Sequence, residues 1–561
     1  MRPALHLLPS LRSHAALPIN ALRHFSVSGQ PTATPSASDH PRLKELRDRL
    51  AADGGKGIFP TPPAEASLTS DPPPPDSYAF HLKTYGCQMN VSDSEVVRSI
   101  MLSSPQPRFH EVTEEALADV SLTNTCAIRD NAEKKVWNRA YQLRAASKKA
   151  KRKQVVALLG CMSERIKSDI FSDSKASVDV VCGPDAYRGL PGLLASALEE
   201  GGPASRGCDT QLSFTETYAD VVPRRGDKDA VDAYVSVMRG CNNMCSYCVV
   251  PFTRGRERSK ALADVVEECK RLIFDSGVRE VTLLGQNVNS YHDRTAGGGK
   301  YDVSNDGFTN LYRLRGGEGL FFADLVEAVS DIDDQVRVRF TSPHPKDFPP
   351  HLLQLVGDRP NVCSSLHLPA QSGSDSVLER MRRGYTYDSY MRLVSDARSA
   401  VPGVSLSSDF IAGFCGETEE EHSDTIRLMR EVEYDQAFMF AYSMRGKTHA
   451  HRRMEDDVPD DVKQRRLEEV IETFRSRVQL KNEREELGSE RVVLVEGEAR
   501  RGRGDDAVMM TGRTDGNKRV LFPRVEAAKG EYVKVTIDEV RGHTLRGVEV
   551  GLCDIEGNMS H

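Results

Sequence analysis

The chain has 561 residues, of which 39% are hydrophobic and 28% charged, and its formal net charge is -7. This composition is that of a globular protein of roughly three to four domains, and no apolar run approaches the roughly 20 residues of a membrane helix. Twelve cysteines in a chain of this length are not the disulfide framework of a small secreted domain, and they favour metal-binding thiolates or buried thiols.

The first residues are basic and poor in acid. Residues 1–30 contain Arg2, Arg12 and Arg23, and no acidic residue precedes Asp39. This composition is typical of a transit peptide and predicts a mitochondrial matrix address, where cysteines stay reduced. The alternative is a disordered tail without an address. Residues 31–77 are rich in proline and serine and predict a disordered linker.

Residues 78–200 alternate between strand and helix patterns, which predicts an open parallel α/β domain. Three cysteines, Cys87, Cys126 and Cys161, directly follow the strands YAFHLKTY, ADVSLTNT and QVVALLG. Because the carboxyl ends of neighbouring parallel strands share one edge, these thiols can meet and hold a cluster. The alternative is that each thiol is buried as a small hydrophobic group.

A basic segment lies within this domain. Residues 134–153 hold nine Lys or Arg, with Trp137 and Tyr141 one helical turn apart. A basic helix with aromatic residues is suited to phosphate contacts with RNA. The alternative is a solvated helix face that packs through Trp137.

Residues 227–484 carry six strand patterns separated by helices, which predicts a partial (β/α)6 barrel. One connection, residues 291–319, is long and rich in Gly, Asp and Asn, and it is either a functional loop or a disordered insertion. The strand patterns are YVSVMR, REVTLLG, QVRVRFT, VCSSLHL, VSLSSDFIAG and AFMFAYS.

The most specific motif is GCNNMCSYC, which places Cys241, Cys245 and Cys248 in one loop after the first of these strands. The spacing C-x3-C-x2-C matches neither the usual zinc patterns nor the ferredoxin run. Three thiolates would leave one iron of a [4Fe–4S] cluster open to another ligand. The alternatives are a zinc knuckle or chance clustering.

The last part of the chain combines a long helix with short strands. Residues 460–488 predict an amphipathic helix that ends near Gly488, with one face formed by Leu467, Val470, Ile471, Phe474 and Val478. Five short strand patterns follow within residues 486–555, and they predict a small β-barrel.

The cysteine loop resembles that of the radical SAM superfamily, which implies that the open iron binds S-adenosylmethionine (SAM) and that the cluster splits it to a radical. Tyr247 matches the aromatic residue that packs near the adenine. The segments VTLLGQNVN and DFIAGFCGET resemble SAM-contacting segments, which implies cofactor contacts for Gly285, Gln286, Gly413 and Glu417.

Residues 78 to 555 resemble the MiaB-type methylthiotransferases. The resemblance implies three domains: a methylthiotransferase domain, a radical SAM core and a TRAM domain. It also implies a second [4Fe–4S] cluster on the three N-terminal cysteines. It implies no catalytic residues beyond the ligands of the two clusters. The motifs that carry it are TYGCQMN, NTCAIRDNAE, GC at 160–161, GCNNMCSYC, LLGQNVNSY, LHLPAQSGS, MRRGYT and GRTDGN.

The reaction implied is insertion of sulfur and a methyl group at C2 of N6-isopentenyladenosine-37 in tRNA. The partners implied are a tRNA anticodon stem-loop and an electron donor. The leader and the long loop look most like the eukaryotic mitochondrial branch, named for association with a cyclin-dependent kinase regulatory subunit, which is a further possible partner.

Two segments depart from the bacterial pattern, namely Cys415 in place of a proline and YSMRGKTHAHR in place of Arg–x–Gly–Thr. In FTRGRERS, the arginines at 254, 256 and 258 have either phosphate or the SAM carboxylate as expected partners. The remaining cysteines are read as structural, with Cys415 undecided; they are Cys182, Cys208, Cys269, Cys363, Cys415 and Cys553.

Other functions remain open at this point. A threonylcarbamoyl-adenosine in tRNA, or a protein aspartate, is an alternative substrate of the same reaction. A non-catalytic kinase-regulator binding protein and a purely structural RNA-binding protein are alternatives from other classes.

Overall fold

The computed structural model describes residues 76–126, 130–167, 178–199, 206–295, 308, 318–499 and 508–559. The predicted transit peptide and all but the last two residues of the predicted linker lie outside these ranges, as does most of the long connection 291–319. Within the described ranges, no helix combines the length and the apolar character that a bilayer crossing needs.

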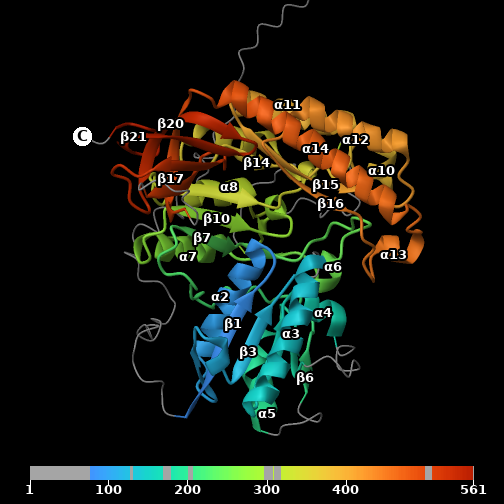
Figure 1. Ribbon diagram of the computed structural model, residues 1–561, viewed down its shortest axis with the longest axis vertical. Coiled ribbons are helices and arrows are strands. Elements are labelled where there is room, and N and C mark those ends of the chain that lie inside the picture. The colour runs from blue at the N-terminus through green and yellow to red at the C-terminus, as the bar shows by residue number, and fades with distance from the viewer. Residues whose placement is uncertain are drawn as a thin grey trace, which may run out of the picture. The chain divides into compact units, whose positions relative to one another are not determined.

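The first domain is built on one six-stranded sheet in which every neighbouring pair is parallel (Figure 1). Its order is β2 (Arg108–Glu111), β1 (Ser77–Thr84), β3 (Val120–Asn124), β4 (Val155–Leu159), β5 (Val180–Cys182) and β6 (Gly207–Asp209). The helices are α2 (Gln88–Leu102), α3 (Asp130–Ala150), α4 (Cys161–Ile166) and α5 (Leu190–Glu199).

The parallel α/β prediction for this domain is confirmed, although the sequence patterns identified only β1, β3 and β4. All residues of β3 and β4 are buried, as expected for strands that are covered on both faces. The strands that were missed have three or four residues each, which is too short to show a periodic pattern.

The central domain contains all six predicted strands. They form two parallel sheets, β13-β10-β7 and β14-β15-β16, and a bridge between Val338 and Val362 links the two. The bounds are β7 (Asp232–Ser236), β10 (Glu280–Leu284), β13 (Arg337–Thr341), β14 (Ser365–His367), β15 (Ser405–Ala412) and β16 (Gln436–Ala441).

Short strands and helices connect these six strands, and two further helices, α13 and α14, follow the last of them. The short strands are β8 (Met238–Arg239), β9 (Arg258–Ser259), β11 (His292–Asp293) and β12 (Leu320–Phe321). The helices are α6 (Val250–Thr253), α7 (Leu262–Phe274), α8 (Phe322–Ser330), α9 (Pro350–Asp358), α10 (Asp375–Arg380), α11 (Tyr387–Ala400), α12 (Glu419–Val432), α13 (His449–Arg453) and α14 (Asp460–Glu485).

Helix α14 buries Val470, Phe474 and Val478, as its sequence pattern predicts. Two lysines are buried on the same helix because each finds a carboxylate: Lys463 binds Asp456 and Lys481 binds Asp435. Leu467 and Ile471 of the predicted face are only partly buried.

The C-terminal strands form a closed barrel in the order β17-β18-β19-β21-β20, which confirms the predicted β-barrel. Its core consists of aliphatic and aromatic residues from all five strands. The strands are β17 (Glu490–Glu498), β18 (Met509–Thr514), β19 (Arg519–Pro523), β20 (Tyr532–Arg541) and β21 (Thr544–Cys553).

Two buried arginines attach this barrel to the amino end of β13. Arg337 donates hydrogen bonds to the carbonyls of Arg513 (2.8 Å) and Val492 (3.1 Å). Arg339 donates to the carbonyl of Asp515 and forms a two-bond ion pair with Glu280. The C-terminal barrel therefore contacts the amino ends of the central strands, whereas the cysteine loop follows their carboxyl ends.

Candidate active site

The three N-terminal cysteines lie at one edge of the first sheet. Cys87 precedes α2, Cys126 follows β3 and Cys161 begins α4, and strands β1, β3 and β4 are direct neighbours. The thiol of Cys87 is hydrogen-bonded with Cys126 and also acts electrostatically on Cys161. The structure therefore brings together three residues that lie 39 and 35 positions apart in the sequence.

Two glycines allow this close approach. Gly86 and Gly160 have φ angles of +120° and +87°, which an L residue rarely adopts. A Cβ atom on Gly86 would lie 2.8 Å from the Cβ of Cys126, and one on Gly160 would lie 2.2 Å from Asn124 Oδ1. A side chain at either position would therefore push the cysteine loops apart.

The thiols in this group differ in acidity. The hydrogen bond from Cys126 lowers the pKa of Cys87 to about 6, and Asn90 and Arg254 act in the same direction. Burial raises the pKa of Cys161, although Arg254 partly offsets that effect. Because the thiolate is the metal ligand, a nearby arginine favours binding by both cysteines.

The central cysteines form a second group in the loop after β8. Burial and the neighbouring thiols raise the pKa of Cys241, and burial raises that of Cys248 to about 12. The backbone N–H of Asn243 donates to Cys241 Sγ (3.4 Å). Arg383, from the motif MRRGYT, donates to Cys245 Sγ (3.4 Å) and to the carbonyl of Pro369 (2.7 Å).

The two thiol groups adjoin each other. Cys161 packs against Val249, the residue that follows Cys248. Helix α4, which begins at Cys161, contacts helix α6, which begins at Val250. Arg254, at the end of α6, donates from Nε to Cys161 Sγ at 3.0 Å.

The donor set fits iron–sulfur clusters better than single ions. Among the residues that the structure describes, no three Cys, His, Asp or Glu side chains are arranged to hold one metal ion. A [4Fe–4S] cluster does not need that arrangement, because its cysteines bind separate irons. Each group supplies three thiols and one arginine donor to sulfur, which suits such a cluster.

The predicted SAM-contacting residues lie around the Cys241–Cys248 loop. Tyr247 packs at the edge of a cluster that contains Phe414 and Cys415. Gln286 Oε1 accepts a hydrogen bond from the backbone N–H of Gly240 at 2.5 Å. A Cβ atom on Gly285 would lie 2.7 Å from the side chain of Met238, so close packing also requires this glycine.

Gly413 and Glu417 contact each other. The N–H of Gly413 donates to Glu417 Oε2 at 2.6 Å, and Arg466 donates to the same oxygen at 3.1 Å. Burial raises the pKa of Glu417 to about 7 despite the arginine. The carboxylate thus fixes the turn at Gly413, which has a φ angle of +75°.

The interpretation of FTRGRERS as a phosphate or SAM-carboxylate site is wrong for two of its arginines. Arg254 and Arg258 are buried, and they form ion pairs with Asp93 (2.7 Å) and Asp185 (2.5 Å) of the first domain. Arg256 remains exposed. A local sequence could not reveal these partners, because they are more than 70 residues away.

Part of the basic helix α3 already contacts other residues of the first domain. Arg139 pairs with Glu115 and Arg144 with Asp179, while Trp137 packs against the core. Tyr141 is 38% exposed. Packing through Trp137 is therefore observed, and the exposed lysines of the helix stay available for other contacts.

Six further cysteines belong to neither group, although Cys415 shares a cluster with Tyr247 of the Cys241–Cys248 loop. Cys269 is fully buried on α7, as expected from its sequence pattern. Cys182, Cys363, Cys415 and Cys553 are buried as well, whereas Cys208 is exposed.

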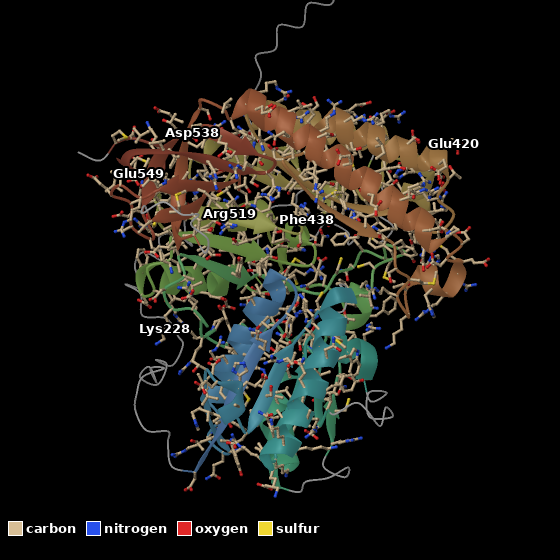
Figure 2. The ribbon with its side chains drawn as sticks, viewed as in Figure 1. Lys228, Glu420, Phe438, Arg519, Asp538 and Glu549 are labelled. Atoms are coloured by element: carbon tan, nitrogen blue, oxygen red, sulfur yellow. The ribbon has the colours of Figure 1, made fainter. Side chains whose placement is uncertain are left out.

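Sequence patterns did not predict that one face of the strands β14–β16 exposes aromatic side chains. On β16, Phe438 and Phe440 are 46% and 41% exposed, although both belong to a parallel strand. Phe438, labelled in Figure 2, lies opposite Asp409 in register and packs edge-on against His367. This face of β14–β16 therefore presents two half-exposed aromatic rings, with the side chains of His367 and Asp409 (14% and 32% exposed) beside Phe438. The alternation in AFMFAYS was the available signal.

Three family models match the chain, one in each of its three domains. The Radical SAM superfamily matches residues 235–429, the uncharacterized protein family UPF0004 matches 79–183 and the TRAM domain matches 484–550.

Curated relatives match over nearly the whole length. The human mitochondrial tRNA methylthiotransferase CDK5RAP1 is 46% identical over 93% of this chain and 92% of its own. A CDK5RAP1-like protein of Oryza sativa subsp. japonica is 50% identical over 92% and 90%. The tRNA-2-methylthio-N(6)-dimethylallyladenosine synthase of Chloroherpeton thalassium is 43% identical over 83% and 95%. With its two cysteine groups and its three matching domains, the chain belongs to the radical SAM tRNA methylthiotransferase family.

Proposed function

We propose that this chain is a mitochondrial tRNA methylthiotransferase that converts N6-isopentenyladenosine-37 to its 2-methylthio form. The proposal rests on the contact between the two thiol groups. Cys161 packs against Val249, the residue that directly follows Cys248. A radical generated at one group would arise beside sulfur held at the other. The C2–H of an adenine is not acidic enough for ordinary base catalysis, so this proximity suits the chemistry.

The six cysteines take separate roles in this proposal. Cys241, Cys245 and Cys248 hold the cluster that binds SAM, with Tyr247 and the segments around Gly285–Gln286 and Gly413–Glu417 beside it. Cys87, Cys126 and Cys161 hold the second cluster. When bound, the clusters and SAM supply a radical, a sulfur atom and a methyl group.

The chain's own residues orient these ligands. Arg383 donates to Cys245 and also to the carbonyl of Pro369, so it ties two motifs to the cysteine loop. The Gly413–Glu417 turn is fixed by Arg466 from α14. Tyr247 covers the apolar cluster at Phe414. These buried contacts limit the number of conformations that the SAM-binding loop can adopt.

The exposed face of β14–β16 is the proposed platform for the target base. Proteins that read RNA specifically take unpaired bases and stack them on aromatic side chains. Phe438 and Phe440 provide such surfaces, and His367 and Asp409 beside them provide hydrogen-bonding groups. An anticodon stem-loop presents position 37 as an unpaired base, which suits this face.

Domain limits and location follow as further parts of the proposal. We assign residues 78–200 to the methylthiotransferase domain, 227–484 to the radical SAM core and 486–555 to the TRAM domain. The acid-poor leader before residue 31 is proposed to direct the protein to the mitochondrial matrix.

The function is tested with reconstituted protein and two anticodon stem-loops, one isopentenylated and one threonylcarbamoylated. Mass spectrometry of the nucleosides should show a gain of the methylthio group only on the isopentenylated RNA. Modification of the threonylcarbamoylated RNA alone would contradict the substrate assignment. Binding of RNA without turnover, together with absence of iron, would instead favour a non-catalytic protein.

A further inference from the structure

Arg254 belongs to the central domain but lies in the cysteine group of the first domain. It follows helix α6 and is 1% exposed. Its Nε donates to Cys161 Sγ at 3.0 Å, and its Nη2 lies 2.7 Å from Asp93 Oδ2. A buried guanidinium with one thiol and one carboxylate as neighbours is fixed in position.

The terminal nitrogens of this guanidinium lack hydrogen bonds. Within the described ranges, Nη1 and Nη2 of Arg254 are buried and neither makes a hydrogen bond, although Nη2 lies at ion-pair distance from Asp93. An unpaired buried donor is costly, and native structures almost always satisfy such groups. Since Nε of the same planar group donates to Cys161 Sγ, the guanidinium lies directly beside the cysteine group.

A second arginine, Arg239, allows the ion pair with Asp93 to be compared with and without a contact to a thiol. Arg239 is equally buried and also binds Asp93, at 2.8 Å. Its other contacts are the carbonyl of Pro184 (2.8 Å), the carboxylate of Asp185 (3.5 Å) and the ring of Tyr218. Like Arg254, it has a buried nitrogen, Nε, that makes no hydrogen bond within the described ranges. The two arginines therefore share a carboxylate, but only Arg254 of the pair donates a hydrogen bond to a thiol.

We propose that Arg254 is a positioning residue for the second cluster, holding Cys161 through its Nε hydrogen bond and keeping a buried positive charge beside the cluster-binding thiols. The inference rests on the proposed function, because it takes Cys161 to be a cluster ligand. Hydrogen bonds to the sulfurs set the reduction potential of such clusters, and they favour the reduced, more negative state. Through Arg254, the central domain therefore sets a property of the cluster held by the first domain.

The test uses the full chain with Cys241, Cys245 and Cys248 changed to alanine, so that only the second cluster forms. Arg254→Gln and its matched control Arg239→Gln are made in this background. Each removes one buried cation beside Asp93, but only the first removes a donor to sulfur. Iron and sulfide are counted per chain, and the midpoint potential is measured by a redox titration followed by electron paramagnetic resonance.

Arg254→Gln is expected to make reduction about tenfold less favourable, which is about 59 mV for one electron. Arg239→Gln should shift the potential much less. Loss of iron from Arg254→Gln but not from Arg239→Gln also supports the proposal, because Cys161 is then no longer held. Arg254→Lys, which keeps the charge without the planar fork, should fall between the parent and Arg254→Gln.

Equal shifts in the two glutamine variants, equal loss of iron from both, or unchanged potentials would overturn the role of Arg254. If the parent chain with three alanines binds no cluster at all, the proposed function fails together with this inference. A cluster whose potential ignores Arg254 overturns only the inference. The two failures are therefore distinguishable.

Discussion

Replacing Phe438 by alanine removes the central aromatic side chain of the proposed base platform. The ring is 46% exposed, and its described aromatic neighbour is His367, with ring centroids 6.0 Å apart. Stacking of one base on an aromatic side chain contributes about 1–3 kcal/mol. Loss of that stacking should lower kcat/KM for the stem-loop by about 5- to 150-fold.

The same substitution should leave the fold intact. Truncation of a fully buried phenylalanine costs about 3–5 kcal/mol, and a half-exposed ring should cost about half of that. Phe438→Tyr, which keeps the stacking surface, should retain most of the activity. The control is Phe274→Ala at the end of α7, since Phe274 is 64% exposed and lies outside the platform.

The assay measures single-turnover methylthiolation at several RNA concentrations, together with SAM cleavage without RNA. Phe438→Ala should reduce RNA-dependent turnover while RNA-independent cleavage stays unchanged. Equal activities for Phe438→Ala and Phe274→Ala would refute the assignment of this face to the base. A parallel loss of SAM cleavage would show that Phe438 acts on the SAM site instead.

Three further predictions concern stability. Burial raises the pKa of Glu95 from 4.5 to about 7, so its stabilising effect is full below pH 4.5 and is lost as the pH rises through 7. In Glu95→Gln, the free energy of unfolding should change between pH 5 and pH 8 by up to about 3 kcal/mol less than in the parent protein. The same change of the urea midpoint between pH 5 and pH 8 in both proteins would contradict this prediction. Gly160→Ala should cost more than about 1 kcal/mol and reduce bound iron, because its Cβ would lie 2.2 Å from an amide oxygen. Gly403→Ala is its control, with a φ angle of +74° but nothing within 4 Å, and equal thermal shifts would exclude the steric effect. Arg339→Met removes the two-bond ion pair of buried Glu280, whose remaining partner Arg513 lies 3.7 Å away, and it should cost about 3–5 kcal/mol at pH 8. Because Arg339 helps hold the pKa of Glu280 at about 2, the loss should be smaller at pH 5, and a loss independent of pH would be inconsistent with this role.

The sequence predicted the thiol groups because their positions depend on local order. Each N-terminal cysteine follows a strand, and parallel strands end at one edge, so the sequence indicated that Cys87, Cys126 and Cys161 can lie near one another. The loop with Cys241 needed no fold at all, since its three thiols lie within eight residues. Strong local patterns of this kind also identified the six central strands and the C-terminal barrel.

The parts that could not be predicted depend on contacts between distant segments. Arg254 has an ordinary basic context in the sequence, and only the fold shows that Asp93 and Cys161 are its partners. Helix α14 buries Lys463 and Lys481 because carboxylates from other elements meet them. The exposure of Phe438 follows from which face of β16 the helices leave uncovered, and a strand pattern alone does not state that.

The division of labour between the two thiol groups is tested most directly by Cys87→Ala. The protein with all six proposed cluster ligands intact should bind about eight irons and eight sulfides, since each [4Fe–4S] cluster brings four of each. Cys87→Ala should bind about four of each, lose methylthiolation and still cleave SAM at the Cys241–Cys248 loop. If SAM cleavage and methylthiolation disappear together while the protein stays folded, or if eight irons remain, the two groups do not have the separate roles assigned to them.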